Sequence, residues 1–148
     1  MVKFRKIINF RYNKTMITNE ELINKAGSAV NSKKVGEYAI GNVGAALITD
    51  KGNVYSGVCI DVGSSMGFCA EHNAIGSMIT AGEYKIKKIV AVWKDDKNNT
   101  YILSPCGRCR EFMRQIDNDN LETDVILEKD KTAKLKDLLP FYDWCHKM

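Results

Sequence analysis

Two spacings of hydrophobic residues succeed each other along this chain of 148 residues. Apolar residues at helical spacing follow Thr18, whose TNEE sequence is typical of a helix N-cap, and they predict a helix over residues 19–31. Two β-rich runs follow, VGAALIT over 43–49 and VYSGVCI over 54–60, and the short segment between them contains Gly52. Such a pattern predicts a β-hairpin after the first helix.

Helices and strands alternate in the rest of the chain. A polar loop over 61–67 leads into a second predicted helix that ends near Gly82. A third predicted helix starts in SPCGRCREFMRQI, with Ser104 as its N-cap and Pro105 as its first helical residue. The further predicted strands cover residues 87–93, 100–103 and 123–128. Strands that alternate with helices after a hairpin predict an α/β sandwich around a five-stranded mixed sheet.

Length and charge indicate one folded domain preceded by a basic arm. The chain is 45% hydrophobic, which is enough for a single core, and we expect one domain over residues 16–148. Residues 1–15 contain five basic and no acidic residues, so the arm carries +5 and the remainder −1. A basic arm can bind nucleic acid or a membrane, or act as a transit peptide; the simpler interpretation is a disordered leader ahead of Met16.

Cysteine content and hydropathy indicate a reducing compartment. No apolar run is long enough to span a bilayer, and the first residues do not resemble a secretory signal. Five cysteines in such a chain are expected to serve as metal ligands, nucleophiles or small core residues rather than as disulfides. We therefore expect a cytoplasmic protein without membrane association.

Three of the cysteines stand near one acidic residue in a pattern that favours metal chemistry. Cys69 and Glu71 open the second predicted helix, with Glu71 on its apolar side, where an unpaired carboxylate is costly. Cys106 and Cys109 form an i, i+3 pair on the third predicted helix. A C-x-x-C pair alone is ambiguous between a metal site, a redox dithiol and chance. Together with Cys-Ala-Glu it predicts a Zn²⁺ site of three thiolates with one open position, beside which Glu71 can move protons.

These motifs resemble those of the cytidine deaminase superfamily, in particular the small tetrameric cytidine deaminases and the blasticidin-S deaminases. The matching segments are VGAAL (43–47), CAE (69–71), SPCGRCRE (104–111) and LLP (138–140). The resemblance covers residues 37–144. It implies a three-layer α/β/α fold, one catalytic zinc ion per subunit, and a homotetramer with active sites at subunit contacts.

The resemblance also implies a role for individual residues. It places the zinc ligands at Cys69, Cys106 and Cys109 and the proton shuttle at Glu71. It places backbone contacts to the substrate ring at Ala70 and Ser104. The implied reaction replaces the exocyclic amine of an aminopyrimidine nucleoside by oxygen and releases ammonia.

The predicted substrate-binding residues depart from the family pattern. Nucleoside-specific members read the ribose with Asn-x-Glu, where this chain has Cys59-Ile60-Asp61. Asp61 can accept a sugar hydroxyl, whereas Cys59 replaces an amide poorly. The family aromatic residue before VGAAL is also replaced, by Gly41. Loss of such partners relaxes or redirects specificity, so cytidine, deoxycytidine and blasticidin S all stay open. Trp144 is expected to reach a neighbouring subunit's pocket.

The charge of the predicted metal site requires compensation. Three thiolates and Zn²⁺ sum to −1, which makes a bound water less acidic than neutral ligands would. Helix N-termini offset part of this charge, and we expect a further hydrogen-bond donor to a ligand thiolate from His72, Arg108 or Arg110.

Two other functions compete with a nucleoside deaminase. A nucleic-acid base deaminase is supported only by the basic arm, and the nearly neutral remainder of the chain argues against it. A non-enzymatic zinc domain or a thiol redox protein would use Cys106 and Cys109. A structural zinc site needs four ligands, however, and a redox dithiol would not require Glu71.

Overall fold

A seven-stranded mixed sheet forms the middle layer of the protein in a computed structural model, which describes residues 17–143 and 147. The strands are β1 (Lys33–Val35), β2 (Tyr38–Thr49), β3 (Val54–Ile60), β4 (Ile86–Lys94), β5 (Thr100–Leu103), β6 (Asp124–Glu128) and β7 (Lys131–Lys134). β4 pairs with β6 in parallel, and every other strand pair is antiparallel. The predicted arm over residues 1–15 and Trp144 lie outside the described residues.

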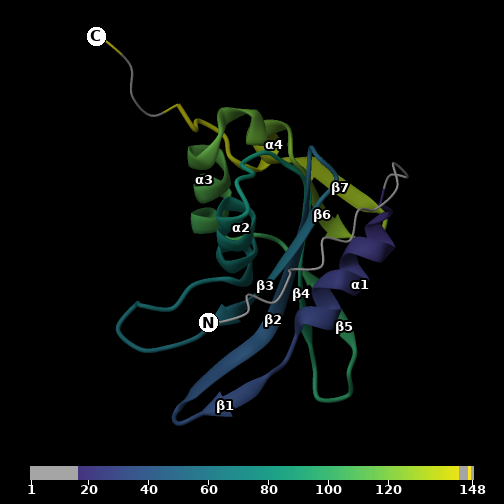
Figure 1. Cartoon of the computed structure of the whole chain (residues 1–148), viewed down its shortest axis with the longest axis vertical. Helices are drawn as coiled ribbons and strands as arrows, with labels where there is room; N and C mark the ends of the chain where they lie inside the picture. Colours follow the sequence, from purple (N-terminus) through teal and green to yellow (C-terminus); the bar gives the residue numbers. More distant parts are fainter. Residues whose placement is uncertain (1–16, 144–146, 148) are drawn as a thin grey trace, which may run out of the picture.

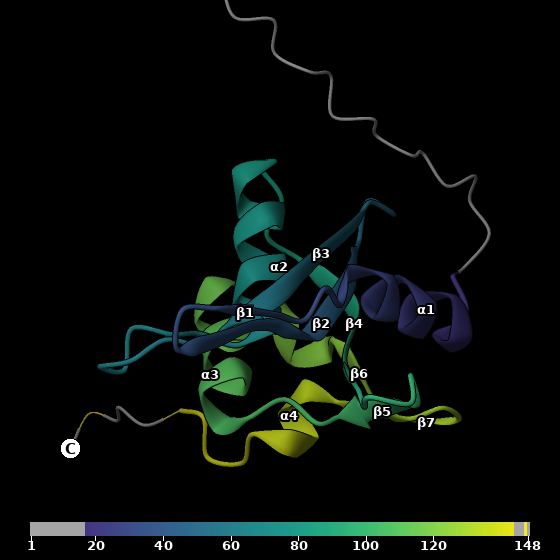
Figure 2. The same cartoon turned by 90° about the horizontal axis from the view of Figure 1, so that it is seen from below.

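Helices cover both faces of the sheet. They are α1 (Asn19–Ala29), α2 (Ala70–Thr80), α3 (Gly107–Ile116) and the short α4 (Leu135–Leu138), with a 3-10 turn at Asn118–Glu122. α1 lies on one face, and α2 and α3 lie on the other, in both views of the fold (Figures 1 and 2). The predicted three-layer α/β/α sandwich is therefore confirmed.

Each face of the sheet has its own apolar core, and the central strand β2 contributes to both. Ala45 and Leu47 pack with α2 and α3, whereas Ala46 and Ile48 pack with α1. Alternate residues of a strand point to opposite faces, so a strand covered on both sides is apolar at every position. This explains why VGAAL reads as a continuous hydrophobic run.

The strands that the sequence did not reveal are short edge strands. β1 is exposed at all three residues, and β7 is exposed or half-buried throughout. Neither strand carries the alternation that marks a half-buried strand, so neither was among the predicted strands. The five predicted strands all exist, although β2 begins five residues earlier than predicted, at Tyr38.

Close contact between α2 and the sheet depends on a glycine in β3. A Cβ atom on Gly57 would lie 2.4 Å from the backbone nitrogen of Ala74, in the middle of α2. Carbon and nitrogen cannot approach so closely, and any side chain here would push the helix away. Gly57 thus sets the distance between β3 and the helix that carries Cys69 and Glu71.

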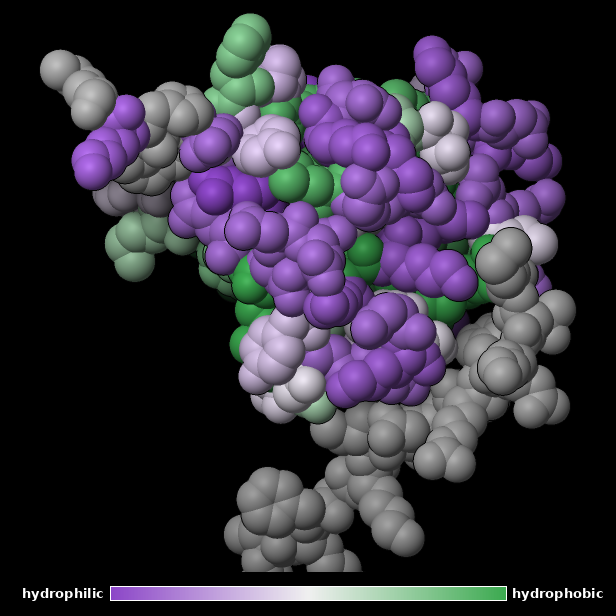
Figure 3. Space-filling view, turned by 90° about the horizontal axis from the view of Figure 1, so that it is seen from above, coloured by the Kyte–Doolittle hydropathy of each residue, from purple (hydrophilic) through white to green (hydrophobic). Residues whose placement is uncertain are grey.

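The surface is mostly hydrophilic on the face shown in Figure 3, where hydrophobic surface appears only in small areas between polar side chains. Within residues 17–143, no helix has the length and apolar character needed to cross a membrane.

A buried carboxylate joins the end of α2 to the β2–β3 hairpin. Glu83 is only 5% exposed, and its Oε1 accepts hydrogen bonds from Asn53 Nδ2 at 2.5 Å and Tyr55 OH at 2.8 Å. Burial opposes ionisation of this carboxyl, but hydrogen bonds from Thr49, Tyr55 and Asn53 outweigh it and hold the pKa of Glu83 below its ordinary value. The carboxylate therefore stabilises the folded state.

We expect Glu83→Gln to lower the free energy of unfolding by about 1–3 kcal/mol at pH 7, since the hydrogen bonds from Asn53 and Tyr55 then have a neutral acceptor in place of a charged one. Because the folded-state pKa is depressed, this contribution is present above the ordinary pKa of 4.5 and disappears as pH falls through the folded-state pKa. Urea unfolding of both proteins at pH 7 and at lower pH measures it. The exposed Glu37→Gln serves as the control, and an equal gap between wild type and Glu83→Gln at all pH values would contradict the assignment.

Candidate metal centre

The N-termini of α2 and α3 meet at one end of the sheet and present matching sets of side chains. Cys69 is the N-cap of α2 and Cys106 is the N-cap of α3. Three residues further along, α2 carries His72 and α3 carries Cys109. Residues separated by three positions lie on the same side of a helix, so each N-terminus contributes one pair.

The predicted start of α3 was wrong by two residues. Ser104 was expected as the N-cap and Pro105 as the first helical residue, but the helix begins at Gly107 and Cys106 is its N-cap. The carbonyl of Cys106 accepts the first helical hydrogen bond, from the Arg110 backbone, while the Arg110 side chain binds the carbonyl of Pro105. Ser104 and Pro105 thus precede the helix, and the N-cap position is used by a sulfur-bearing residue.

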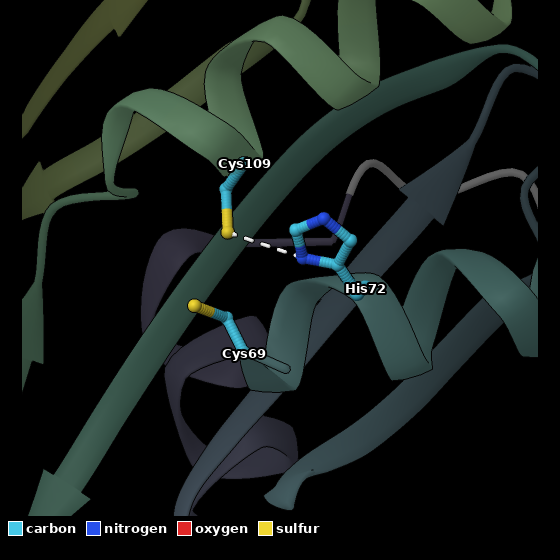
Figure 4. A group of neighbouring side chains, drawn as sticks. All are labelled: Cys69, His72 and Cys109. Carbon is cyan, nitrogen blue, oxygen red and sulfur yellow. Dashed lines mark hydrogen bonds between the residues drawn. The ribbon is translucent and has the colours of Figure 1, made fainter. Parts of the chain in front are cut away.

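Three sulfur atoms converge between the two helices. The Sγ atom of Cys106 lies 3.7 Å from that of Cys69 and 3.5 Å from that of Cys109. The sulfurs of Cys69 and Cys109 also lie within 4.8 Å of each other and of a nitrogen of His72. Figure 4 shows the imidazole turned toward Cys109, with Nδ1 at 3.5 Å from its sulfur. The cluster therefore offers a metal either three sulfurs or two sulfurs and a nitrogen.

A cavity of about 200 Å³ opens beside the sulfurs. Its walls include six of the residues predicted for the site or for substrate binding: Cys59, Cys69, Ala70, Glu71, Ser104 and Cys106. Cys109 is fully buried, His72 stacks on the ring of Phe112 at 4.4 Å, and neither borders the cavity. The side of the cluster that faces the cavity is thus formed by Cys69 and Cys106.

Among residues 17–143, Glu71 is the one acidic residue that borders this cavity. Its side chain belongs to the first turn of α2 and the residue is only 5% exposed. Burial raises the pKa of Glu71, and a hydrogen bond with the Cys109 thiol opposes part of that rise. A carboxyl group with a raised pKa can both hold and release a proton nearer to neutral pH.

The thiols themselves favour a bound cation. Burial raises the pKa of Cys69 and of Cys109, and the charge of Glu71 raises that of Cys109 further. Burial opposes ionisation of Cys106 too, but hydrogen bonds from Cys109 and from its neighbours lower the Cys106 pKa. Three thiolates this close repel one another unless a cation lies among them. Soft sulfur donors of this number suit Zn²⁺.

Of the three expected helper donors, only His72 brings its side chain to a thiol, whereas Arg108 contacts the Cys106 thiol through its backbone. The Arg110 side chain donates to the carbonyls of Pro105 and Leu138, at 2.8 and 2.9 Å. Arg108 Nη1 points to the carbonyl of Gly67, at 3.4 Å. Burial and then the charge of Arg108 lower the pKa of His72, so its imidazole is neutral at neutral pH. A neutral imidazole can donate one hydrogen bond to a thiolate from Nδ1.

The structure separates the two residues expected to read the sugar. Cys59 borders the cavity, whereas Asp61 is exposed beyond the end of β3 and does not. Three apolar wall residues were not predicted from the sequence: Val43, Ala91 and Leu103. They stand on strands, where nothing in the sequence distinguishes a cavity wall from a core position. The contact between the side chain of Asn42 and Cys59 was not predicted either.

Comparison with known proteins gives consistent matches. The sequence profile described as "Cytidine and deoxycytidylate deaminase zinc-binding region" matches residues 16–123. A probable cytidine deaminase of Dictyostelium discoideum is 33% identical over 99 residues, which cover 65% of each chain. A blasticidin-S deaminase of Bacillus cereus is 38% identical over 77 residues, 49% of this chain and 55% of that one. The chain thus spans less than two thirds of either relative.

A solved structure extends the likeness to the whole fold. The cytidine deaminase of Burkholderia pseudomallei superposes with a TM-score of 0.67 at 27% identity, over 84% of this chain and 98% of that one. The profile matches well over half of the sequence, and the chain therefore belongs to the cytidine and deoxycytidylate deaminase family.

Proposed function

We propose that this protein is a zinc-dependent hydrolase that deaminates an aminopyrimidine nucleoside of the cytidine or deoxycytidine type and releases ammonia. The observation that carries the proposal is the convergence of three sulfurs beside a buried carboxylate at the wall of one cavity. The sulfurs can bind a metal, the cavity can hold a small substrate, and the carboxylate can transfer protons.

Zinc is assigned to Cys69, Cys106 and Cys109, with the partial positive charge of two helix N-termini offsetting the thiolates. The imidazole of His72 supports Cys109 from the side away from the cavity. Ligands of this kind are commonly oriented by a hydrogen-bonding neighbour. When bound, zinc supplies the Lewis acidity that makes water a nucleophile at neutral pH.

Glu71 moves the protons in the proposed reaction. Its carboxylate accepts a proton from water as the oxygen attacks the ring carbon and passes it to the adjacent ring nitrogen; it then transfers the proton of the added hydroxyl to the amine, which leaves as ammonia while the carbon–oxygen bond becomes a carbonyl. Its raised pKa suits both steps. Ala70 and Ser104 border the cavity, and in the proposed complex their backbone atoms bind the ring. The apolar walls at Val43, Ala91 and Leu103 suit a planar aromatic system.

Blasticidin S is the second candidate substrate. Cys59, a weak hydrogen-bonding group, borders the cavity where an amide or carboxylate would select a sugar more strongly. The match to the blasticidin-S deaminase of Bacillus cereus supports the same alternative. A nucleic-acid substrate has less support, because the chain outside residues 1–15 carries a net charge of only −1.

The proposed enzyme is a homotetramer of the cytoplasm, where its thiols stay reduced. Self-association is supported by the exposed aromatic pair of Trp93 and Tyr101, whose rings lie 5.1 Å apart on the strands next to the cavity. Exposed aromatic side chains in contact are typical of surfaces that a partner covers.

Single substitutions separate the two possible ligand sets. We expect Cys69→Ala, Cys106→Ala and Cys109→Ala each to remove most of the bound zinc, because each removes a ligand. We expect His72→Ala to weaken zinc binding by roughly 10- to 100-fold without abolishing it, as for a hydrogen-bonding neighbour of a ligand. Zinc content by atomic spectroscopy and competition with a chelator provides the measurement.

Cys59→Ala is the matched control, since it removes a cavity thiol outside the cluster and should leave about one zinc per chain. Retention of zinc by Cys106→Ala together with its complete loss in His72→Ala would replace the three-sulfur assignment by Cys69, His72 and Cys109. A disulfide between Cys106 and Cys109 in a zinc-free protein would instead indicate a redox function.

The activity itself is tested by ammonia release from cytidine, deoxycytidine, blasticidin S and a cytosine-containing oligonucleotide. We expect turnover of a free nucleoside, and a loss of roughly 100-fold or more in Glu71→Gln because the proton shuttle is removed. Zinc content should stay at the wild-type level in this variant. Full activity of Glu71→Gln, or turnover of the oligonucleotide alone, would be incompatible with the proposal.

A further inference from the structure

The segment that carries Cys106 into the site belongs to no helix or strand. Residues 104–106 connect the end of β5 to the start of α3, and the residues at the two ends of the segment, Ser104 and Cys106, both border the cavity. Pro105, between them, is buried and has no backbone N–H group. Its backbone can therefore be anchored only through its carbonyl, and whatever binds this oxygen influences the position of both cavity residues.

Arg110 binds the carbonyl of Pro105 and the next carbonyl along the chain. Its Nε donates a hydrogen bond to the carbonyl of Pro105 at 2.8 Å, and its backbone N–H donates to the carbonyl of Cys106 at 3.0 Å. The peptide bond between Pro105 and Cys106 is trans, so its N–H points away from its carbonyl. By holding these two carbonyls, Arg110 fixes the plane of the peptide that leads into Cys106.

The far end of the Arg110 side chain is anchored in another element. Its Nη1 donates to the carbonyl of Leu138 at 2.9 Å. Leu138 is the last residue of α4 and packs against the apolar core on the α2 and α3 side of the sheet. The last carbonyls of a helix lack helical partners, and a cationic side chain is favourable there. The guanidinium thus joins the segment before α3 to a fixed point on the core.

We propose that Arg110 is a positioning residue of the active site, which sets the place of Ser104 and Cys106 through the carbonyl of Pro105. The inference rests on the proposed function and extends it, because Cys106 is an assigned zinc ligand and Ser104 an assigned contact of the substrate ring. Arg110 does not border the cavity and acts through Pro105. Groups that orient a metal ligand commonly contribute about 10- to 100-fold to metal affinity or activity.

The variant Arg110→Lys tests the contact with Pro105 while it keeps the positive charge. A lysine side chain has a methylene group where arginine has Nε, so the donor to Pro105 is lost, whereas its ammonium can still reach toward Leu138. We expect this variant to release zinc to a chelator about 10- to 100-fold faster than wild type. The value of kcat/KM, measured with the substrate that wild type turns over, should fall by a similar factor. Arg110→Ala should lose at least as much.

Arg114→Lys is the matched control. Arg114 is also half-buried on α3, one turn further along, and its Nη2 donates to Oε1 of Glu111 on the same helix at 2.6 Å. We expect this variant to release zinc and turn over substrate as wild type does, even if its melting temperature falls. Melting temperatures of all variants identify a simple loss of stability. If Arg110→Ala does not fold, Arg110→Lys still provides the comparison.

The outcomes separate the role of Arg110 from the proposed function. Wild-type zinc release and kcat/KM in Arg110→Lys would overturn the positioning role, because the charge alone would then be sufficient. Losses no larger than those of Arg114→Lys would overturn it as well, as a general effect of weakening α3. If wild type binds zinc but turns over no substrate, the proposed function fails, whereas zinc release still decides whether Arg110 positions Cys106. Wild-type protein that binds no zinc would overturn both.

Discussion

Confinement of three thiols and one carboxylate between two helix N-termini is the constraint on which this structure depends. The sulfur of Cys106 is in contact with those of Cys69 and Cys109, which lie within 4.8 Å of each other, and Glu71 is buried beside them. Burial opposes ionisation of each group, although hydrogen bonds outweigh it at Cys106, and the negative charges repel one another. A divalent cation removes that penalty, so metal binding and folding of this region are expected to be coupled.

The remaining architecture holds these two N-termini in place. α2 is set against β3 by the close approach at Gly57, and its far end is joined to the β2–β3 hairpin through Glu83. The end of α3 is tied to β4 by Asn120, a fully buried side chain that accepts from Ile86 N and donates to the carbonyl of Met113. Rigid supports of this kind keep ligands in position before the metal arrives.

The sequence predicted the features that depend on local pattern. The capping box at Thr18, the hairpin after α1 and the two cysteine-bearing helices follow from spacing, and the structure contains them all. It did not predict the short edge strand β1, whose exposed residues carry no alternation, or the true start of α3, where Ser104 and Pro105 imitate a helix N-terminus. The contact between Asn42 and Cys59 depends on a bulge that spans two strands, and no single segment encodes it.

Among the site residues, proximity could be predicted but chemical role could not. Cys-Ala-Glu and Cys-Gly-Arg-Cys indicated that their side chains would meet, and the structure brings Cys69, Glu71, Cys106 and Cys109 together. The sequence could not show which of His72, Arg108 and Arg110 lies with its side chain beside a thiol, because this depends on the directions of the three side chains in the fold. Asp61, which the sequence placed near the sugar, lies beyond the cavity wall because β3 ends before it.

X-ray absorption at the zinc edge of the purified enzyme tests the central claim most directly. The account predicts three sulfur ligands at about 2.3 Å and a single oxygen at about 2.0 Å from solvent, with no change of first-neighbour distances in His72→Ala. Imidazole scattering that is lost in His72→Ala, or a fourth sulfur ligand, would contradict the account.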